Sequence, residues 1–288
     1  MEIAHFFDSA TSTLSYIVFD PKTKDAIVVD PVMDYDPASG QISRTSVDLL
    51  ISFIEKNQLI LHASLETHAH ADHITGAQLL KNKYPNIKIG IGRHIVAVQK
   101  TFSLVFNIEH VMTDGSQFDF LFLEGLSYDF GSIGVEAIET PGHTPACVAY
   151  RIGGNLFTGD AILMPDSGTG RCDFPGGSSK DLYHSIHEKL YKLSDNMRIF
   201  VGHDYQPGGR KLEFETSIGK EKAENIQLKE ATSAEEYIKF RSDRDMQLSA
   251  PRLLLPSIQI NINAGVLPEP ESNGTRYLKM PIVPSAKA

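Results

Sequence analysis

The sequence has few cysteines and no recognisable export signal. Cys147 and Cys172 are its two cysteines, enough for one disulfide, so their number alone does not exclude an exported protein. Residues 1–8 (MEIAHFFD) have neither the basic region nor the apolar stretch of a signal peptide, and they lack the Arg-rich character of a transit peptide. We therefore expect a cytoplasmic protein with both thiols reduced.

Long apolar segments and an excess of basic residues are also missing. No run reaches the roughly 18 apolar residues that a membrane helix needs, so we expect no contact with a membrane. The net charge of −9 argues against a nucleic-acid partner, because phosphate binding requires a concentrated basic surface. A small anionic substrate is still compatible with this charge, since a few local Arg or Lys residues can outweigh the global balance.

The composition is that of a globular protein, with 41% hydrophobic and 22% charged residues. A chain of 288 residues has room for one large domain or two small ones. We find no internal repeat and no convincing linker. The sequence therefore predicts one domain over 1–288, with a core at about 3–210 and a helical and extended extension at about 211–288.

Short strands and helices alternate along the core. Residues 31–43 are predicted to be an irregular loop, and the chain beyond about residue 244 a proline-rich extended tail. Strands are predicted at 15–20, 26–30, 59–65, 87–91, 135–140, 147–152, 155–158 and 198–201. Helices are predicted at 46–56, 74–81 and 182–193, with mostly helical structure from 212 to about 244. This order indicates an α/β fold.

Four of these strands end directly in a histidine or an aspartate, at His68, His143, Asp160 and His203. Side chains on loops anchored to a sheet are a common way to build a rigid site. His70, Asp72 and His73 follow the first of them within five residues. Such a cluster is hard to explain by packing, whereas imidazoles at i and i+2 converge on one ion when the loop curls. The pattern therefore predicts a metal site.

The motifs that carry these residues resemble the metallo-β-lactamase superfamily. Thr67 to His73 matches its H-x-H-x-D-H signature, and Pro141 to Thr144, Thr158 to Asp160 and Gly202 to Asp204 match its later ligand motifs in order. The resemblance covers about residues 3–210. It implies the αββα sandwich of that superfamily, in which two mixed sheets are flanked by helices and the metal lies at one edge.

Within the superfamily the sequence is similar to the persulfide dioxygenases, also called sulfur dioxygenases. This narrower similarity lies in Gly168 to Phe174, Gly202 to Tyr205 and the tail residues Arg244-Asp245, Leu255-Pro256 and Ala264 to Pro268. It implies one Fe(II) per chain, held by the catalytic ligands His68, His143 and Asp160. Two histidines and one carboxylate are the ligand set of many non-haem Fe(II) oxygenases. His70, Asp72, His73 and His203 would then orient those ligands.

The activity implied is oxidation of glutathione persulfide by dioxygen to sulfite and glutathione. Glyoxalase II is a related alternative: all seven ligand-type residues are retained, so their spacing also permits a hydrolase of glutathione thioesters with zinc or a second metal. The resemblance further implies a homodimer. A separate sulfurtransferase as the source of persulfide is left open.

Four further residues are weaker candidates for the site. Arg171, in a Gly-rich loop after Asp160, can pair with a substrate carboxylate, and Tyr205 can hydrogen-bond substrate or oxygen. Lys222, on a predicted helix, is a further substrate-binding candidate. Asp173 is expected to anchor the loop of Arg171, while Cys172 is interpreted as a small buried or loop residue, because a reactive thiol needs an accessible electropositive site.

Overall fold

The computed structural model describes residues 1–109 and 111–282, so the end of the predicted extension lies outside the described residues. The strands are β1 (Glu2–Asp8), β2 (Thr13–Phe19), β3 (Asp25–Val29), β4 (Val32–Asp36), β5 (Gln41–Ser43), β6 (Ile60–Glu66), β7 (Ile74–Thr75), β8 (Lys88–Gly92), β9 (Phe120–Phe122), β10 (Ser127–Phe130), β11 (Ile133–Glu139), β12 (Val148–Ile152), β13 (Asn155–Gly159), β14 (Arg198–Val201) and β15 (Glu215–Ser217). The helices are α1 (Thr45–Lys56), α2 (Ala77–Lys83), α3 (Ile95–Phe106), α4 (Ser179–His184), α5 (Ile218–Glu224), α6 (Ala234–Asp245) and α7 (Leu254–Asn261). Short helical turns of other types are η1 (Ser185–Lys189), η2 (Leu190–Lys192) and η3 (Pro207–Gly209).

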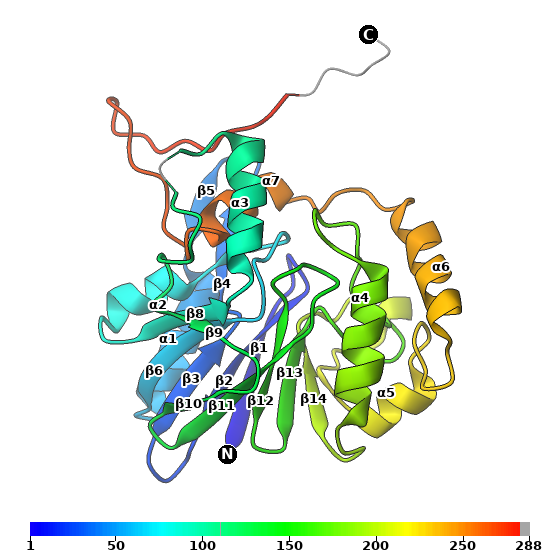
Figure 1. Ribbon diagram of the computed structural model, residues 1–288. Coiled ribbons are helices and arrows are strands. Elements are labelled where there is room, and N and C mark those ends of the chain that lie inside the picture. Colours follow the sequence, from blue (N-terminus) through cyan, green and yellow to red (C-terminus); the bar gives the residue numbers. More distant parts are fainter. Residues whose placement is uncertain (110, 283–288) are drawn as a thin grey trace.

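Two six-stranded sheets form the body of the protein (Figure 1). The first has the order β1-β2-β3-β6-β8-β9, and the second has the order β10-β11-β12-β13-β14-β15. Each sheet contains both parallel and antiparallel pairs, for example β3 with β6 and β2 with β3. Helices α1 and α2 lie beside the first sheet, and α4 and α5 beside the second. The predicted α/β fold, a metallo-β-lactamase sandwich of two mixed sheets flanked by helices, is confirmed.

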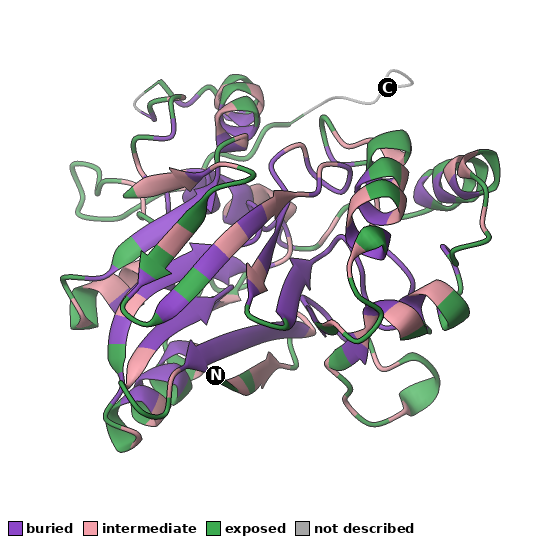
Figure 2. Cartoon of the chain, turned by 60° about the horizontal axis from the view of Figure 1, so that its bottom comes forward, coloured by how far each residue is buried: buried purple, intermediate pink, exposed green. Residues whose placement is uncertain are grey.

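Strand β2 shows why the sheets pack as they do, because all seven of its residues are buried. Tyr16 and Val18 face the core between the two sheets, while Ile17 and Phe19 face the cluster under α1 and α2. Alternate residues of a strand point to opposite faces, so a strand covered on both faces is apolar throughout. Figure 2 shows the result, with buried strands inside and exposed residues on the outer faces of the helices.

The direction of the strands brings the predicted metal ligands to one edge. Strands β11 and β13 are both antiparallel to β12, and β14 is parallel to β13, so β11, β13 and β14 end on the same side of the second sheet. Their following residues include His143, Asp160 and His203. Backbone hydrogen bonds join this edge to the first sheet, from Val148 N to Thr67 O at 2.9 Å and from Leu14 N to Gly202 O at 2.8 Å.

Several predicted elements differ from the structure. The loop at 31–43 contains β4 and β5, and the helix expected at 74–81 starts only at Ala77, after the two residues of β7. The helix expected at 182–193 is α4 followed by η1 and η2. The tail expected to be extended contains α7, which tolerates Pro256 because the backbone amide of a residue in the first turn needs no helical partner.

No helix in the described part of the chain is long and apolar enough to cross a membrane.

Helix α5 carries a buried carboxyl group that has no counterpart among the predicted site residues. Glu221 is fully buried, and its Oε2 accepts a hydrogen bond from Asn225 Nδ2 at 2.7 Å. Asn225 Nδ2 also donates to Gly168 O at 3.1 Å. Burial disfavours the charged form and raises the pKa of Glu221 from 4.5 to about 7, although the bond from Asn225 opposes the rise.

This shift predicts how stability depends on pH. The folded pKa lies above the unfolded one, so the stability that protonated Glu221 contributes is fully present below pH 4.5 and is lost as the pH rises through about 7. We expect Glu221→Gln to remove that loss and to raise the free energy of unfolding above pH 7, relative to the wild type, by up to about 3 kcal/mol. Urea unfolding of the wild type and the variant at pH 5 and pH 8 measures this difference in free energy of unfolding. If the difference is the same at both pH values, the prediction is contradicted.

Candidate metal centre

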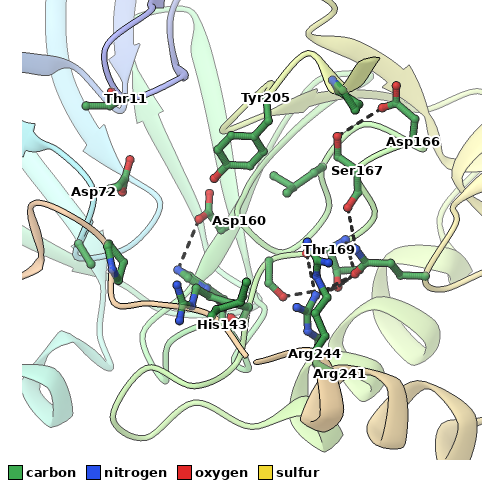
Figure 3. Close-up of a pocket in the computed structure, with 18 of the residues that line it drawn as sticks. Thr11, Asp72, His143, Asp160, Asp166, Ser167, Thr169, Tyr205, Arg241 and Arg244 are labelled. Carbon is green, nitrogen blue, oxygen red and sulfur yellow. Dashed lines mark hydrogen bonds and ion pairs between the residues drawn. The ribbon is translucent and has the colours of Figure 1, made fainter. Parts of the chain in front are cut away.

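His68, His143 and Asp160 come together from three different loops. One ligand atom of each lies within 4.8 Å of those of the other two, and His143 Nε2 is 3.4 Å from Asp160 Oδ2. All three residues are buried, and His68 is only 1% exposed. Figure 3 shows the ring of His143 beside the carboxylate of Asp160 at the floor of a pocket. The predicted set of two histidines and one carboxylate is therefore assembled at one point.

The histidines of this cluster are held by their outer ring nitrogens. His143 Nδ1 donates to Arg171 O at 2.6 Å, and His203 Nδ1 donates to Ser12 O at 3.1 Å. Thr67 Oγ1 donates to Asp30, so it accepts from His68 Nδ1 at 3.0 Å. Metal-binding histidines characteristically donate their second nitrogen in this way, which fixes the tautomer and the ring orientation.

The inner atoms of the cluster fit a metal ion. His68 Nε2, His70 Nδ1, His73 Nε2 and Asp160 Oδ1 are buried and have no hydrogen-bond partner within the described residues. A buried polar atom without a partner costs about 1–3 kcal/mol, so four of them in one place require an explanation. A cation held by His68, His143 and Asp160 would satisfy two of these atoms, and a cation held by His70, Asp72 and His73 would satisfy the other two, because imidazole nitrogen and carboxylate oxygen are ordinary metal ligands.

His70, Asp72 and His73 form a second possible ligand set, with one ligand atom of each again within 4.8 Å of the others. His203 Nε2 lies between the two sets, 3.3 Å from Asp72 Oδ2 and 3.3 Å from Asp160 Oδ1. The geometry of these four predicted residues thus permits a second ion as well as a role in orienting the ligands of the first.

Two acidic residues behind this cluster were missed by sequence analysis. His70 Nε2 is 3.0 Å from Asp30 Oδ1 and 3.5 Å from Glu66 Oε2, and both carboxylates are buried. Asp30 also accepts hydrogen bonds from Thr67 N at 2.7 Å and from Thr67 Oγ1 at 2.8 Å. A signal for Asp30 existed, because it follows an apolar strand just as the four predicted ligands do.

Burial and charge divide the protonation states of the cluster. Burial, together with the neighbouring His70 and His143, holds the pKa of His68 well below its ordinary value. His68 is thus neutral, the form in which an imidazole nitrogen binds metal. Burial would also lower the pKa of His203, but the charges of Asp160 and Asp72 outweigh it and raise that pKa. Asp160 and Asp72 thus favour the charged form of the His203 imidazole.

A cavity of about 660 Å³ opens over Asp160 and His143. Arg244, at the end of α6, and Arg252, just before α7, lie in its wall, and both are exposed. Neither has an ion-pair partner within residues 1–109 and 111–282. Figure 3 shows Arg241 and Arg244 extending from α6 toward the cavity. An arginine-lined cavity beside the candidate ligands suits an anionic small molecule.

The weaker candidates fall into two groups. Arg171 and Tyr205 both line the cavity, and the Tyr205 hydroxyl points toward Asp160 in Figure 3. Asp173 binds the guanidinium of Arg171 through both carboxylate oxygens, which agrees with an anchoring role. Lys222 is not brought to the site: it is absent from the described lining of the cavity, and its Nζ lies 2.6 Å from Asp195 Oδ1.

Cys172 adjoins Arg171 but does not present a reactive thiol. It is buried, and burial raises its pKa, so the thiol stays protonated. Burial likewise raises the pKa of Cys147 to about 12. Both cysteines are free.

Comparisons with known proteins agree with this geometry. The model of the metallo-beta-lactamase superfamily matches residues 9–203. The chain is 45% identical over 284 residues to "Glyoxylase B2" of Dictyostelium discoideum, covering 98% of this chain and 96% of the relative. It is 30% identical to the mitochondrial persulfide dioxygenase ETHE1 of Homo sapiens, covering 92% and 89%.

A solved structure extends the likeness to three dimensions. The crystal structure of ETHE1 from Myxococcus xanthus matches with a TM-score of 0.74 and 27% identity, covering 92% of this chain and all of that one. The chain therefore belongs to the metallo-beta-lactamase superfamily, as a metal-binding enzyme of the hydrolase or dioxygenase type.

Proposed function

We propose that this protein is an Fe(II)-dependent dioxygenase that oxidises glutathione persulfide. The observation that carries the proposal is the convergence of His68, His143 and Asp160 on one point under the cavity. Two imidazoles and one carboxylate leave several positions of an iron ion open for dioxygen and substrate. The likeness to the human and Myxococcus proteins, both named ETHE1, supports the same reaction class.

The reaction balances with dioxygen as the oxidant. The outer sulfur of the persulfide loses four electrons to one dioxygen molecule, and the sulfur–sulfur bond breaks. With one water, the products are glutathione, sulfite and two protons. When bound, Fe(II) would supply the electron-transfer chemistry that lets dioxygen react with the sulfur. No protein nucleophile is needed, which fits the buried, protonated state of Cys172.

The residues of the chain would position the two reactants. Glutathione carries two carboxylates. Arg244 and Arg252 in the cavity wall, which have no ion-pair partner among the described residues, can bind them through charge-assisted hydrogen bonds. Arg171 is already engaged by Asp173 and donates to Ser249 O at 2.8 Å, so it shapes the wall more than it offers a free charge. The Tyr205 hydroxyl, directed toward Asp160, can donate to a reactant bound there.

A glyoxalase II-like hydrolase of glutathione thioesters is the second candidate. The observation in its favour is the complete second set His70, Asp72 and His73, with His203 bridging toward Asp160. Two metal ions there would clamp the attacking and leaving groups of a hydrolysis. The name of the Dictyostelium relative points in this direction. A homodimer, a separate sulfurtransferase that supplies persulfide and a cytoplasmic location remain predictions.

Oxygen consumption tests the proposal directly. We expect protein loaded anaerobically with Fe(II) to take up oxygen when glutathione persulfide is added, with sulfite formed in equal amount. His143→Ala and Asp160→Ala each remove a ligand and should lower the rate by at least a hundredfold. His184→Ala, an exposed position of α4, is the control and should keep the wild-type rate.

The hydrolase alternative predicts a different result in this experiment. An absence of oxygen uptake, together with hydrolysis of a glutathione thioester by protein holding two zinc ions per chain, would establish the hydrolase. Metal content measured on the same samples separates a true loss of activity from incomplete loading.

The arginines of the cavity wall give a second prediction. Arg244→Gln and Arg252→Gln should each raise KM for glutathione persulfide roughly tenfold with little change in kcat, because each removes a charge-assisted hydrogen bond to a distant carboxylate. The persulfide of 2-mercaptoethanol has no carboxylate, so its KM should not change. The matched control is Arg151→Gln, which alters an arginine of β12 that forms an ion pair with Glu136 of β11. Equal effects on both substrates would contradict the assignment.

A further inference from the structure

The segment that follows the superfamily core contacts both metal loops. Helices α6 and α7 lie beyond residues 9–203, which the superfamily model matches. In Figure 1 these two helices lie in different places, α6 beside α4 and α7 beside α3. Each nevertheless places a buried polar side chain against a loop that carries candidate metal ligands.

On α6 the contact is made by Asp245, which is 6% exposed. Its Oδ2 accepts a hydrogen bond from the backbone amide of Cys172 at 2.7 Å. The same carboxylate is bound by Arg241, one turn earlier on the helix, through Nε at 3.1 Å and through Nη2. Arg241 is itself 1% exposed, so the two charges are removed from water together and neutralise each other.

Arg241 makes further contacts with the loop of Cys172, which follows Asp160. Its Nη1 donates to Thr169 O at 3.1 Å and to Gln227 Oε1 at 2.8 Å. The loop is thus held at Thr169 by Arg241 and at Cys172 by Asp245. Between these points the amide of Gly170 donates to Asp160 O at 2.9 Å. A Cβ on Gly170 would lie 2.2 Å from that oxygen, so the approach requires glycine.

The held segment includes the acceptor that orients a metal ligand. Arg171 O, adjacent to the amide that Asp245 binds, accepts the hydrogen bond from His143 Nδ1 at 2.6 Å. The position of this carbonyl therefore sets the tautomer and the direction of the His143 ring. Asp245 reaches the ring through one peptide unit and touches neither the ligand nor the cavity.

On α7 the corresponding contact is made by Asn261, which is 4% exposed. Its Nδ2 donates to His70 O and to His73 O, both at 2.8 Å, and its Oδ1 accepts from Thr75 N at 2.9 Å. A single amide side chain thus satisfies three backbone groups of the loop that runs from His68 to Thr75. These bonds hold the curl that directs the histidines of this loop inward.

We propose that Asp245 and Asn261 are positioning residues of the metal centre, and that the segment beyond the superfamily core sets the affinity and geometry of the site from two sides. Side chains that hold metal ligands in place typically change metal affinity by 10–100-fold when they are altered. This inference concerns metal binding alone, so it holds for a dioxygenase and for a hydrolase alike.

The test compares two pairs of variants in the full chain. Asp245→Ala is paired with Asp243→Ala, which breaks the exposed ion pair to Lys239 on the same helix. Asn261→Leu is paired with Asn263→Leu, which alters a half-buried asparagine two residues further on whose Nδ2 donates to Val266 O at 3.4 Å. We expect Asp245→Ala and Asn261→Leu to lower the affinity for Co(II), measured by competition with a chelator, by at least tenfold. Both controls should bind as the wild type does.

A spectrum distinguishes positioning from general loosening of the fold. The visible absorption of bound Co(II) reports the coordination geometry, so it should change in band position or intensity in the two test variants and in neither control. Circular dichroism and thermal melting of the metal-free proteins verify folding. If Asp245→Ala does not fold, Asp245→Asn, which keeps the volume and one acceptor oxygen, replaces it and should give a smaller shift. Wild-type affinity and spectrum in folded Asp245 and Asn261 variants would overturn the proposal.

Discussion

The structure depends on the burial of a dense group of imidazoles and carboxylates at one edge of a sandwich. His68, His70, His73 and His203 are each at most 2% exposed, and Asp30 and Glu66 lie just behind them. Such a group is unfavourable in a protein interior unless each polar atom has a partner. The fold supplies partners for the outer atoms, and the inner atoms are left to a cation.

This requirement explains the arrangement of the two sheets. Strands β11, β13 and β14 deliver their ligands at one edge, and β6 delivers the H-x-H-x-D-H loop from the other sheet. Backbone hydrogen bonds such as that from Val148 to Thr67 join the edges directly, so a ligand on one sheet is fixed relative to those on the other. The core between the sheets, with large side chains such as Tyr16, Tyr150 and Phe157, keeps that spacing rigid.

The sandwich could be predicted because the ligand motifs resemble those of the superfamily, and the seven ligand-type residues could be proposed because they lie in short local motifs. Apolar strands that end in His68, His143, Asp160 and His203 are visible in short windows of sequence. The residues that hold those ligands were harder to identify. Asn261 and His70 are 191 positions apart, and nothing in the composition of α7 indicates that its asparagine faces a histidine loop. Lys222 was predicted to bind substrate but lies outside the site, because helical spacing alone could not reveal that Asp195 binds it.

The bonds made by Asn261 also determine when the histidine loop can be stabilised during synthesis and folding of the chain. His70 and His73 leave the ribosome 191 and 188 residues before the asparagine that fixes their carbonyl groups. At synthesis rates of about 5–20 residues per second, the loop exists for roughly 10–40 seconds without that support. A metal ion encountered by the growing chain therefore meets ligands whose loop is not yet held. The three bonds to Asn261 can form only after the chain has been made as far as α7, so completion of this centre follows the synthesis of that helix.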